Sequence, residues 1–101
     1  MEVKFTCENG SRNCGDIKLY ALSTCAFCKK ALKYLRENSI SFMYVFVDDM
    51  EPDEKDKLKS ELKEKYKRDV GFPFMIINEE KIIVGFREEE YKSTFNQEQG
   101  A

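Results

Sequence analysis

Two cysteines separated by two residues, Cys25 and Cys28, are the side chains of this sequence most able to do chemistry. They lie where a strand-like segment, residues 17–22, passes into a segment with helical periodicity, residues 26–38. A thiol at the first turn of a helix faces unpaired backbone N–H groups and the positive end of the helix dipole, and both stabilise a thiolate. We therefore expect thiol–disulfide exchange, with Cys25 as the exposed attacking thiol and Cys28, on the apolar side of the helix, as the more buried resolving thiol.

Two other interpretations of the cysteine pair compete with this one. The pair could be half of a zinc site, which requires a second pair of ligands. Because the sequence has no His, only Cys7 and Cys14 could complete a four-cysteine zinc or iron–sulfur site, and their spacing is irregular for either. The thiols could instead be inert core residues, but this does not explain why both lie at a strand-to-helix junction. The context favours the redox interpretation, and we expect no bound metal.

The composition excludes several classes of protein. A chain of 101 residues is long enough for one domain. The 17 basic and 19 acidic residues give a net charge of −2, so no basic excess favours nucleic acid. The absence of His removes Ser–His and Cys–His catalysis. No apolar run is long enough to predict a membrane span and the first residues do not resemble a signal peptide, so we expect a cytoplasmic, monomeric protein.

The hydrophobic periodicity predicts the element order β-α-β-α-β-β-α. The first crossover should be right-handed and make the first two strands parallel, and the later hairpin adds two antiparallel strands. The predicted fold class is therefore α/β, with a four-stranded mixed sheet and helices on both faces. The predicted strands are residues 17–22, 42–47, 74–77 and 81–84, and the predicted helices are residues 26–38, 52–68 and 87–97.

The first 16 residues differ from the rest of the chain. Residues 3–6 alternate like a short strand, and two clusters of turn-forming residues follow them. We interpret residues 1–16 as an N-terminal appendage of limited order, residues 17–97 as the main domain and residues 98–101 as a C-terminal tail.

The appendage contains two further cysteines, Cys7 and Cys14. They could close a small disulfide loop, although a protein of the reducing cytoplasm does not normally keep a structural disulfide. They could be spectator thiols. They could also form an auxiliary redox pair that passes electrons to or from Cys25 and Cys28.

The chain resembles the glutaredoxin family of the thioredoxin fold over residues 17–97. The resemblance rests on Cys25-Ala26-Phe27-Cys28 after the first strand, Phe72-Pro73 before the hairpin and Gly85-Phe86 after the last strand. It implies that the bond before Pro73 is cis, that this proline packs beside the cysteine pair, and that Phe72 offers backbone hydrogen bonds to a bound substrate chain.

The sequence departs from the glutathione-using members of that family. They usually have a Lys three residues before the first cysteine, where this sequence has Leu22, and Pro-Tyr between the cysteines, where it has Ala26-Phe27. They usually have Thr-Val before the proline and Gly-Gly-Asp after the last strand, where this sequence has Gly71-Phe72 and Gly85-Phe86-Arg87. The chain is more similar to the ribonucleotide-reductase-linked redoxins and the glutaredoxin-like proteins of anaerobic bacteria and archaea.

The resemblance implies a dithiol–disulfide oxidoreductase, an electron carrier that reduces protein disulfides through a mixed disulfide. We expect no cofactor, and recharging of the oxidised pair by a thioredoxin-reductase-like enzyme or, less in keeping with the departures above, by glutathione. The alternatives are a non-catalytic binding module with the thioredoxin fold and a Cys-based metal or iron–sulfur protein.

Two surface features of the resembling region could bind a protein partner. The first is a rim of exposed aromatic side chains, Phe27, Phe72 and Phe86, around the cysteine pair; the competing interpretation is that these rings cap the core. The second is the basic side of the first helix, which suggests an acidic docking surface and is equally compatible with an ordinary solvated face. Its residues are Lys29, Lys30, Lys33 and Arg36.

Overall fold

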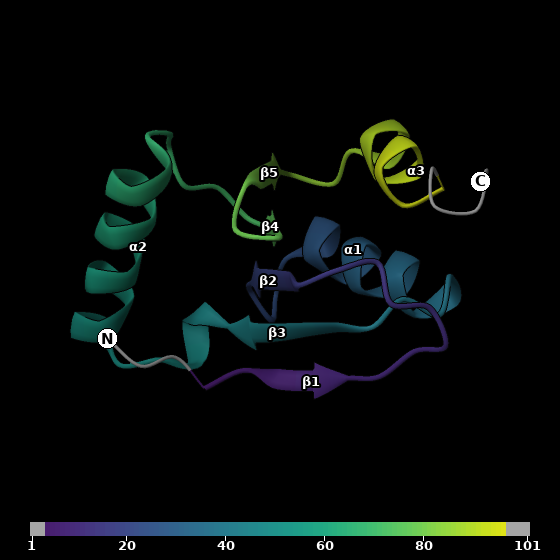
Figure 1. Cartoon of the computed structure of the whole chain (residues 1–101). Helices are drawn as coiled ribbons and strands as arrows, with labels where there is room; N and C mark the ends of the chain where they lie inside the picture. The colour runs from purple at the N-terminus through teal and green to yellow at the C-terminus, as the bar shows by residue number, and fades with distance from the viewer. Residues whose placement is uncertain (1–3, 97–101) are drawn as a thin grey trace.

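The computed structural model describes residues 4–96 of the chain, and from residue 17 onward its strands and helices follow the predicted order (Figure 1). The strands are β1 (Thr6–Glu8), β2 (Ile17–Ala21), β3 (Phe42–Phe46), β4 (Phe74–Ile77) and β5 (Lys81–Val84). The helices are α1 (Ala26–Glu37), α2 (Pro52–Tyr66) and α3 (Glu88–Asn96), with a short 3-10 turn, η1 (Val47–Asp49), after β3. Within the described range, no helix is both long and apolar enough to cross a membrane.

The sheet has five strands in the order β1-β3-β2-β4-β5. β2 and β3 are parallel, as the predicted crossover requires, and β4 and β5 form the predicted antiparallel hairpin. The prediction of four strands was wrong by one, because β1 pairs antiparallel with β3 and forms an edge of the sheet. The strand predicted at residues 3–6 begins only at Thr6, and residue 3 lies outside the described range.

Helices cover both faces of the sheet, as predicted. Neighbouring side chains of a strand point to opposite faces. In β2, Leu19 therefore packs with α1 and α3, whereas Tyr20 packs with α2. In β4, Met75 and Ile76 divide between the same two clusters in the same way. The molecule thus has two apolar cores, one on each side of a single sheet.

Several elements end earlier than predicted, each because of a local backbone feature. Lys67 adopts a left-handed conformation, with φ of 57°, which ends α2 before the predicted end at Arg68. The amide of Asn38 donates to the Tyr34 carbonyl and caps α1. The chain leaves β3 at Val47 to form η1. The predicted end of the last helix, at residue 97, lies outside the described residues.

The segment between β1 and β2, predicted as part of a loosely ordered appendage, is hydrogen-bonded to the rest of the fold. The backbone N–H of Arg12 donates to the Ser39 carbonyl (2.8 Å), and the Ser41 N–H donates to the Arg12 carbonyl (2.9 Å). The Arg12 guanidinium donates to the Phe95 carbonyl at 2.7 Å. The segment therefore connects the C-terminal ends of α1 and α3.

The β4–β5 turn is held by the carboxylate of Glu79. Asn78 and Glu79 both have positive φ, 55° and 62°, as in a type I′ turn. The Glu79 carboxylate accepts hydrogen bonds from the Lys18 ammonium (2.6 Å) and the Tyr66 hydroxyl (2.9 Å), and it pairs with Lys65 (3.3 Å). These contacts, with Lys18 the strongest, lower the pKa of Glu79 to about 2. One side chain thus connects β2, α2 and the hairpin.

Candidate functional site

Cys25 is the N-cap residue of α1, immediately after the turn that follows β2. Its backbone is extended, and its sulfur accepts the backbone N–H of Cys28 at 3.2 Å, in the place where an N-cap oxygen usually accepts. Its own N–H donates to the Leu22 carbonyl at 3.2 Å, and its carbonyl accepts the Lys29 N–H at 3.1 Å. The side chain is half-buried. Cys25 therefore presents its sulfur at the positive end of the helix.

Cys28 lies one turn further along α1 and is fully buried. Its sulfur accepts the backbone N–H of Leu22 at 3.4 Å. Burial, with a smaller contribution from the contact with Cys25, raises the pKa of Cys28 to about 12. At neutral pH this thiol therefore stays protonated, which matches the division into an accessible first thiol and a buried second thiol that the sequence predicts.

Pro73 and Gly85 lie together beside the end of β2. The Phe72–Pro73 peptide bond is cis, as the resemblance implies, and Pro73 is buried. Phe74 pairs with Tyr20 in the antiparallel β2–β4 pair, so Pro73 lies at the same end of the sheet as the turn that leads to Cys25. The Gly85 N–H donates to the Pro73 carbonyl at 2.8 Å. The structure therefore places these two predicted site residues, which are twelve positions apart, next to each other.

The predicted rim of exposed aromatic residues is present at Phe27 and not at the other two positions. Phe27 is 57% exposed and is the only large apolar side chain between residues 4 and 96 that is exposed to solvent. The Lys30 ammonium lies 5.4 Å from the centre of its ring. Phe72 is half-buried against the α2 core. Phe86 is half-buried against the other core, 5.2 Å from the ring of Tyr91. At Phe72 and Phe86 the competing interpretation holds, in which the rings cap the core, because the two rings pack against opposite cores.

Three residues near the cysteines were not identified from the sequence. The carboxylate of Asp48 accepts both the N–H (2.9 Å) and the hydroxyl of Ser23, and these hydrogen bonds lower the pKa of Asp48. The hydroxyl of Tyr91 donates to the Gly85 carbonyl at 3.4 Å, and burial raises the pKa of Tyr91. Paired residues of β2 and β3 are always the same number of positions apart in the sequence. That offset would have predicted the contact of Ser23 with Asp48, but it is known only once the register of the two strands is known.

Cys7 and Cys14 lie far from the Cys25–Cys28 pair. Cys7 is exposed on β1, opposite Met43, and Cys14 is buried shortly before the first residue of β2. Cys25 follows the other end of β2, and a strand of this length spans roughly 15 Å. The structure thus does not bring the four sulfurs together, and among the described residues no three Cys, Asp or Glu side chains are grouped to hold a metal ion.

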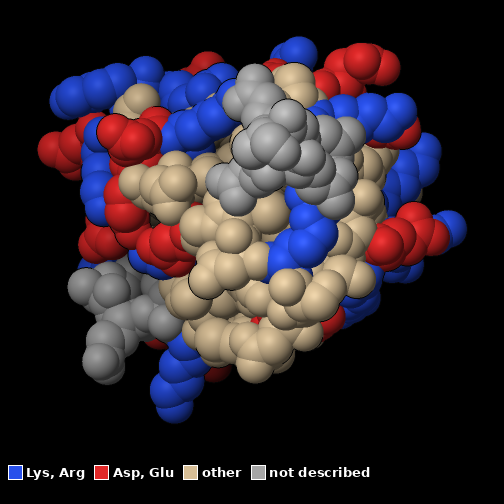
Figure 2. Space-filling view, turned by 45° about the vertical axis from the view of Figure 1, so that its right-hand side comes forward, with Lys and Arg blue, Asp and Glu red and all other residues tan. Residues whose placement is uncertain are grey.

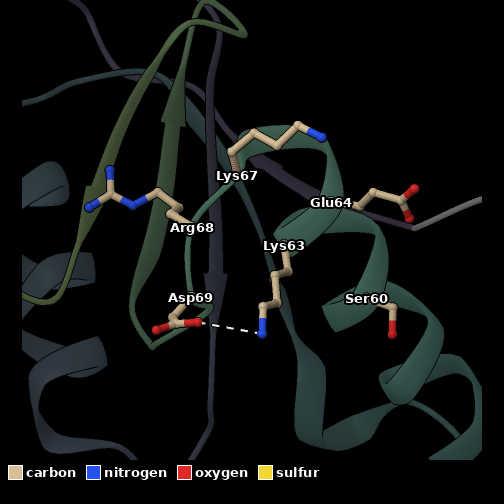
Figure 3. Close-up of a pocket in the computed structure, with 6 residues that line it drawn as sticks. All are labelled: Ser60, Lys63, Glu64, Lys67, Arg68 and Asp69. Carbon is tan, nitrogen blue, oxygen red and sulfur yellow. Dashed lines mark ion pairs between the residues drawn. The ribbon is translucent and has the colours of Figure 1, made fainter.

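A hollow on the described surface lies at the C-terminal end of α2 and contains no cysteine. Figure 3 shows its polar and charged lining, in which Lys63 pairs with Asp69 at 3.6 Å. The lining residues are Ser60, Lys63, Glu64, Lys67, Arg68 and Asp69. None of them was predicted as a site residue, and the hollow offers no group for thiol chemistry.

Comparison with known proteins identifies the family. Residues 17–82 match the Glutaredoxin family profile, a range that includes both cysteines of the pair and Pro73. A glutaredoxin-like 8.6 kDa protein of the rubredoxin operon of Clostridium pasteurianum is 39% identical over 73% of this chain and 89% of its own length. The structure of a glutaredoxin from Methanosarcina mazei superposes with a TM-score of 0.75 at 36% identity, covering 92% of this chain and 88% of that one. Methanoredoxin of Methanosarcina acetivorans superposes with a TM-score of 0.71 at 40% identity, covering 81% and 85%. The chain therefore belongs to the glutaredoxin family and has the thioredoxin fold.

Proposed function

We propose that this protein is a dithiol–disulfide oxidoreductase that reduces disulfides of partner proteins through Cys25 and Cys28. The Cys25 thiolate attacks one sulfur of the partner disulfide and displaces the other as a thiolate, which takes up a proton. The Cys28 thiol then loses its proton and attacks the Cys25 sulfur, which releases the second partner sulfur. Two electrons pass to the partner, which becomes a dithiol, and Cys25 and Cys28 become a disulfide.

The observation that carries this proposal is the unequal setting of the two thiols. Cys25 is only partly buried, and its sulfur accepts a backbone N–H at the start of α1. Cys28 is fully buried, within hydrogen-bonding distance of the same turn. This arrangement favours attack on an outside disulfide by Cys25 and limits Cys28 to attack on its neighbour.

Single Cys→Ser variants test the proposal. We expect Cys25→Ser to abolish reduction of a protein disulfide, and Cys28→Ser to accumulate a mixed disulfide between the partner and Cys25, detected by mass spectrometry. Cys7→Ser is the matched control, because Cys7 is an exposed thiol at the other end of the sheet. A Cys25→Ser variant with full turnover would falsify the assignment.

We also propose that a dedicated reductase, rather than glutathione, recharges the disulfide. Leu22, which stands where glutathione-using members have a Lys, packs against the α2 core, as does Phe72 before the cis proline. The reduction potential separates the two reductants: a value near −270 mV is thioredoxin-like and supports a dedicated reductase, whereas a value between about −200 and −230 mV is glutaredoxin-like and contradicts it.

We propose further that the partner docks on Phe27 and on the outward face of α1. Phe27 follows Cys25 by two residues and carries Lys30 over its ring, and Lys29 and Lys33 are exposed on the same helix. Figure 2 shows cationic and anionic side chains interspersed around the margin of one face of the molecule. A partner with acidic groups beside its disulfide fits this surface. Docking should then weaken as salt concentration rises.

A further inference from the structure

Ser23 and Asp48 continue the pairing of β2 and β3 beyond the point where the two backbones separate. Ala21 pairs with Phe46, and the same separation in sequence places Ser23 opposite Asp48. The backbone ladder stops there because β3 turns into η1 at Val47. The Asp48 carboxylate takes the place of the next ladder carbonyl: one oxygen accepts the Ser23 N–H at 2.9 Å, and the other accepts the Ser23 hydroxyl.

Ser23, which Asp48 holds in this way, lies inside the turn that contacts both cysteines. Leu22, just before it, donates its N–H to the sulfur of Cys28 at 3.4 Å. The carbonyl of Leu22 accepts the N–H of Cys25 at 3.2 Å, which closes the turn around Ser23. Displacement of Ser23 would therefore move the Leu22 N–H, which donates to the Cys28 sulfur, and would also move the backbone of Cys25.

We propose that Asp48 is a positioning residue for the cysteine pair, which holds Ser23 so that the turn aims Cys25 outward and directs the Leu22 N–H at Cys28. The inference rests on the function proposed above and adds to it a residue that touches neither the substrate nor the reacting sulfurs.

The charges around Asp48 are consistent with this role. The two hydrogen bonds from Ser23, with a smaller contribution from the nearby Lys55, lower the pKa of Asp48, so that it is a carboxylate at neutral pH. A carboxylate has acceptors only, which suits two donors from one residue. Burial is the main cause of the raised pKa of Cys28, and the negative charge of Asp48 raises that pKa slightly further.

The test is the second-order rate at which Cys25 of the full-length reduced protein reacts with a chromogenic aryl disulfide, measured in a Cys7→Ser background. We expect Asp48→Ala to slow this rate about tenfold, as the loss of a charge-assisted contact predicts. Asp48→Asn keeps an acceptor for the Ser23 N–H and a polar group for its hydroxyl, so it should stay within about threefold of the parent. Asp49→Ala is the matched control, because it removes the same charge from the exposed neighbouring position.

A double variant shows whether Asp48 acts through Ser23. If it does, Ser23→Ala combined with Asp48→Ala is as slow as Asp48→Ala alone. Ser23→Ala by itself should slow the reaction about threefold, and this variant carries the test if Asp48→Ala does not fold. An Asp48→Ala or Ser23→Ala protein that is folded and reacts at the parent rate overturns the inference, as do additive losses or an Asp48→Asn variant as slow as Asp48→Ala. These results differ from failure of the proposed function, in which Cys25→Ser itself retains turnover.

Discussion

Replacement of Glu79 by Gln tests whether one carboxylate fastens the hairpin turn to β2 and α2. Folding lowers the pKa of Glu79 from 4.5 to about 2, which corresponds to about 3 kcal/mol if the whole shift is converted to stability. The side chain is 43% exposed, however, and ion pairs in contact with water contribute far less than buried ones. We therefore expect Glu79→Gln to lower the free energy of unfolding by about 1 kcal/mol at pH 7.

The pH dependence of this loss identifies its cause. Because the pKa is lower in the folded protein, the stabilisation by Glu79 is present above pH 4.5 and disappears as the pH falls toward about 2. Urea unfolding of the parent and of Glu79→Gln should thus give curves that differ at pH 7 and converge at low pH. Glu80→Gln, at the adjacent exposed position, is the control and should match the parent. An equal loss in both variants, or a difference that does not change with pH, would refute the reasoning.

Three further predictions concern the site and its supports. Phe27→Ser should reduce turnover of a protein disulfide but leave the melting temperature and the rate with a small disulfide unchanged, because the ring is exposed; unchanged protein turnover with lowered stability would contradict the docking role. In a Cys25→Ser variant at neutral pH, Cys28 should resist iodoacetamide, since burial raises its pKa to about 12, and rapid labelling of Cys28 by mass spectrometry would argue against that burial. Arg12→Ala removes the donor to the Phe95 carbonyl and should lower the free energy of unfolding by about 1–2 kcal/mol in denaturant titration, whereas a loss near zero would show that the contact is not stabilising.

The sequence was sufficient to predict the elements whose side chains alternate or repeat with a clear period. β4, β5 and the start of α1 lie where the pattern placed them, because a buried apolar face leaves a strong signal in the order of residues. The unequal burial of Cys25 and Cys28 also followed from that pattern, since Cys28 shares a face with Ala31 and Leu35.

Features that depend on register or on side-chain direction could not be predicted in this way. The alternation at residues 3–6 indicates a short strand, but the three-residue β1 is displaced toward Glu8, and its pairing with β3 at the sheet edge depends on register. The contact of Ser23 with Asp48 requires the offset between two parallel strands, which hydrophobic patterns do not specify. The burial of Phe72 and Phe86 depends on which core each loop faces. The sequence shows only that each is an aromatic residue next to a glycine or a proline, and this does not predict the direction of the ring.

The N-terminal segment has a consequence for the order in which a growing chain can fold. β1 is synthesised before β3, yet Thr6 can pair only when Tyr44 has appeared, and the Arg12 contact with Phe95 spans 83 positions. Closing such long loops costs conformational entropy before the contacts are gained. The parts that hold Cys25 and Cys28, by contrast, come from β2, α1 and β3, which follow one another directly. The segment around β1 is therefore among the last parts of the fold to form its contacts, and the turn that carries Cys25 can form before them.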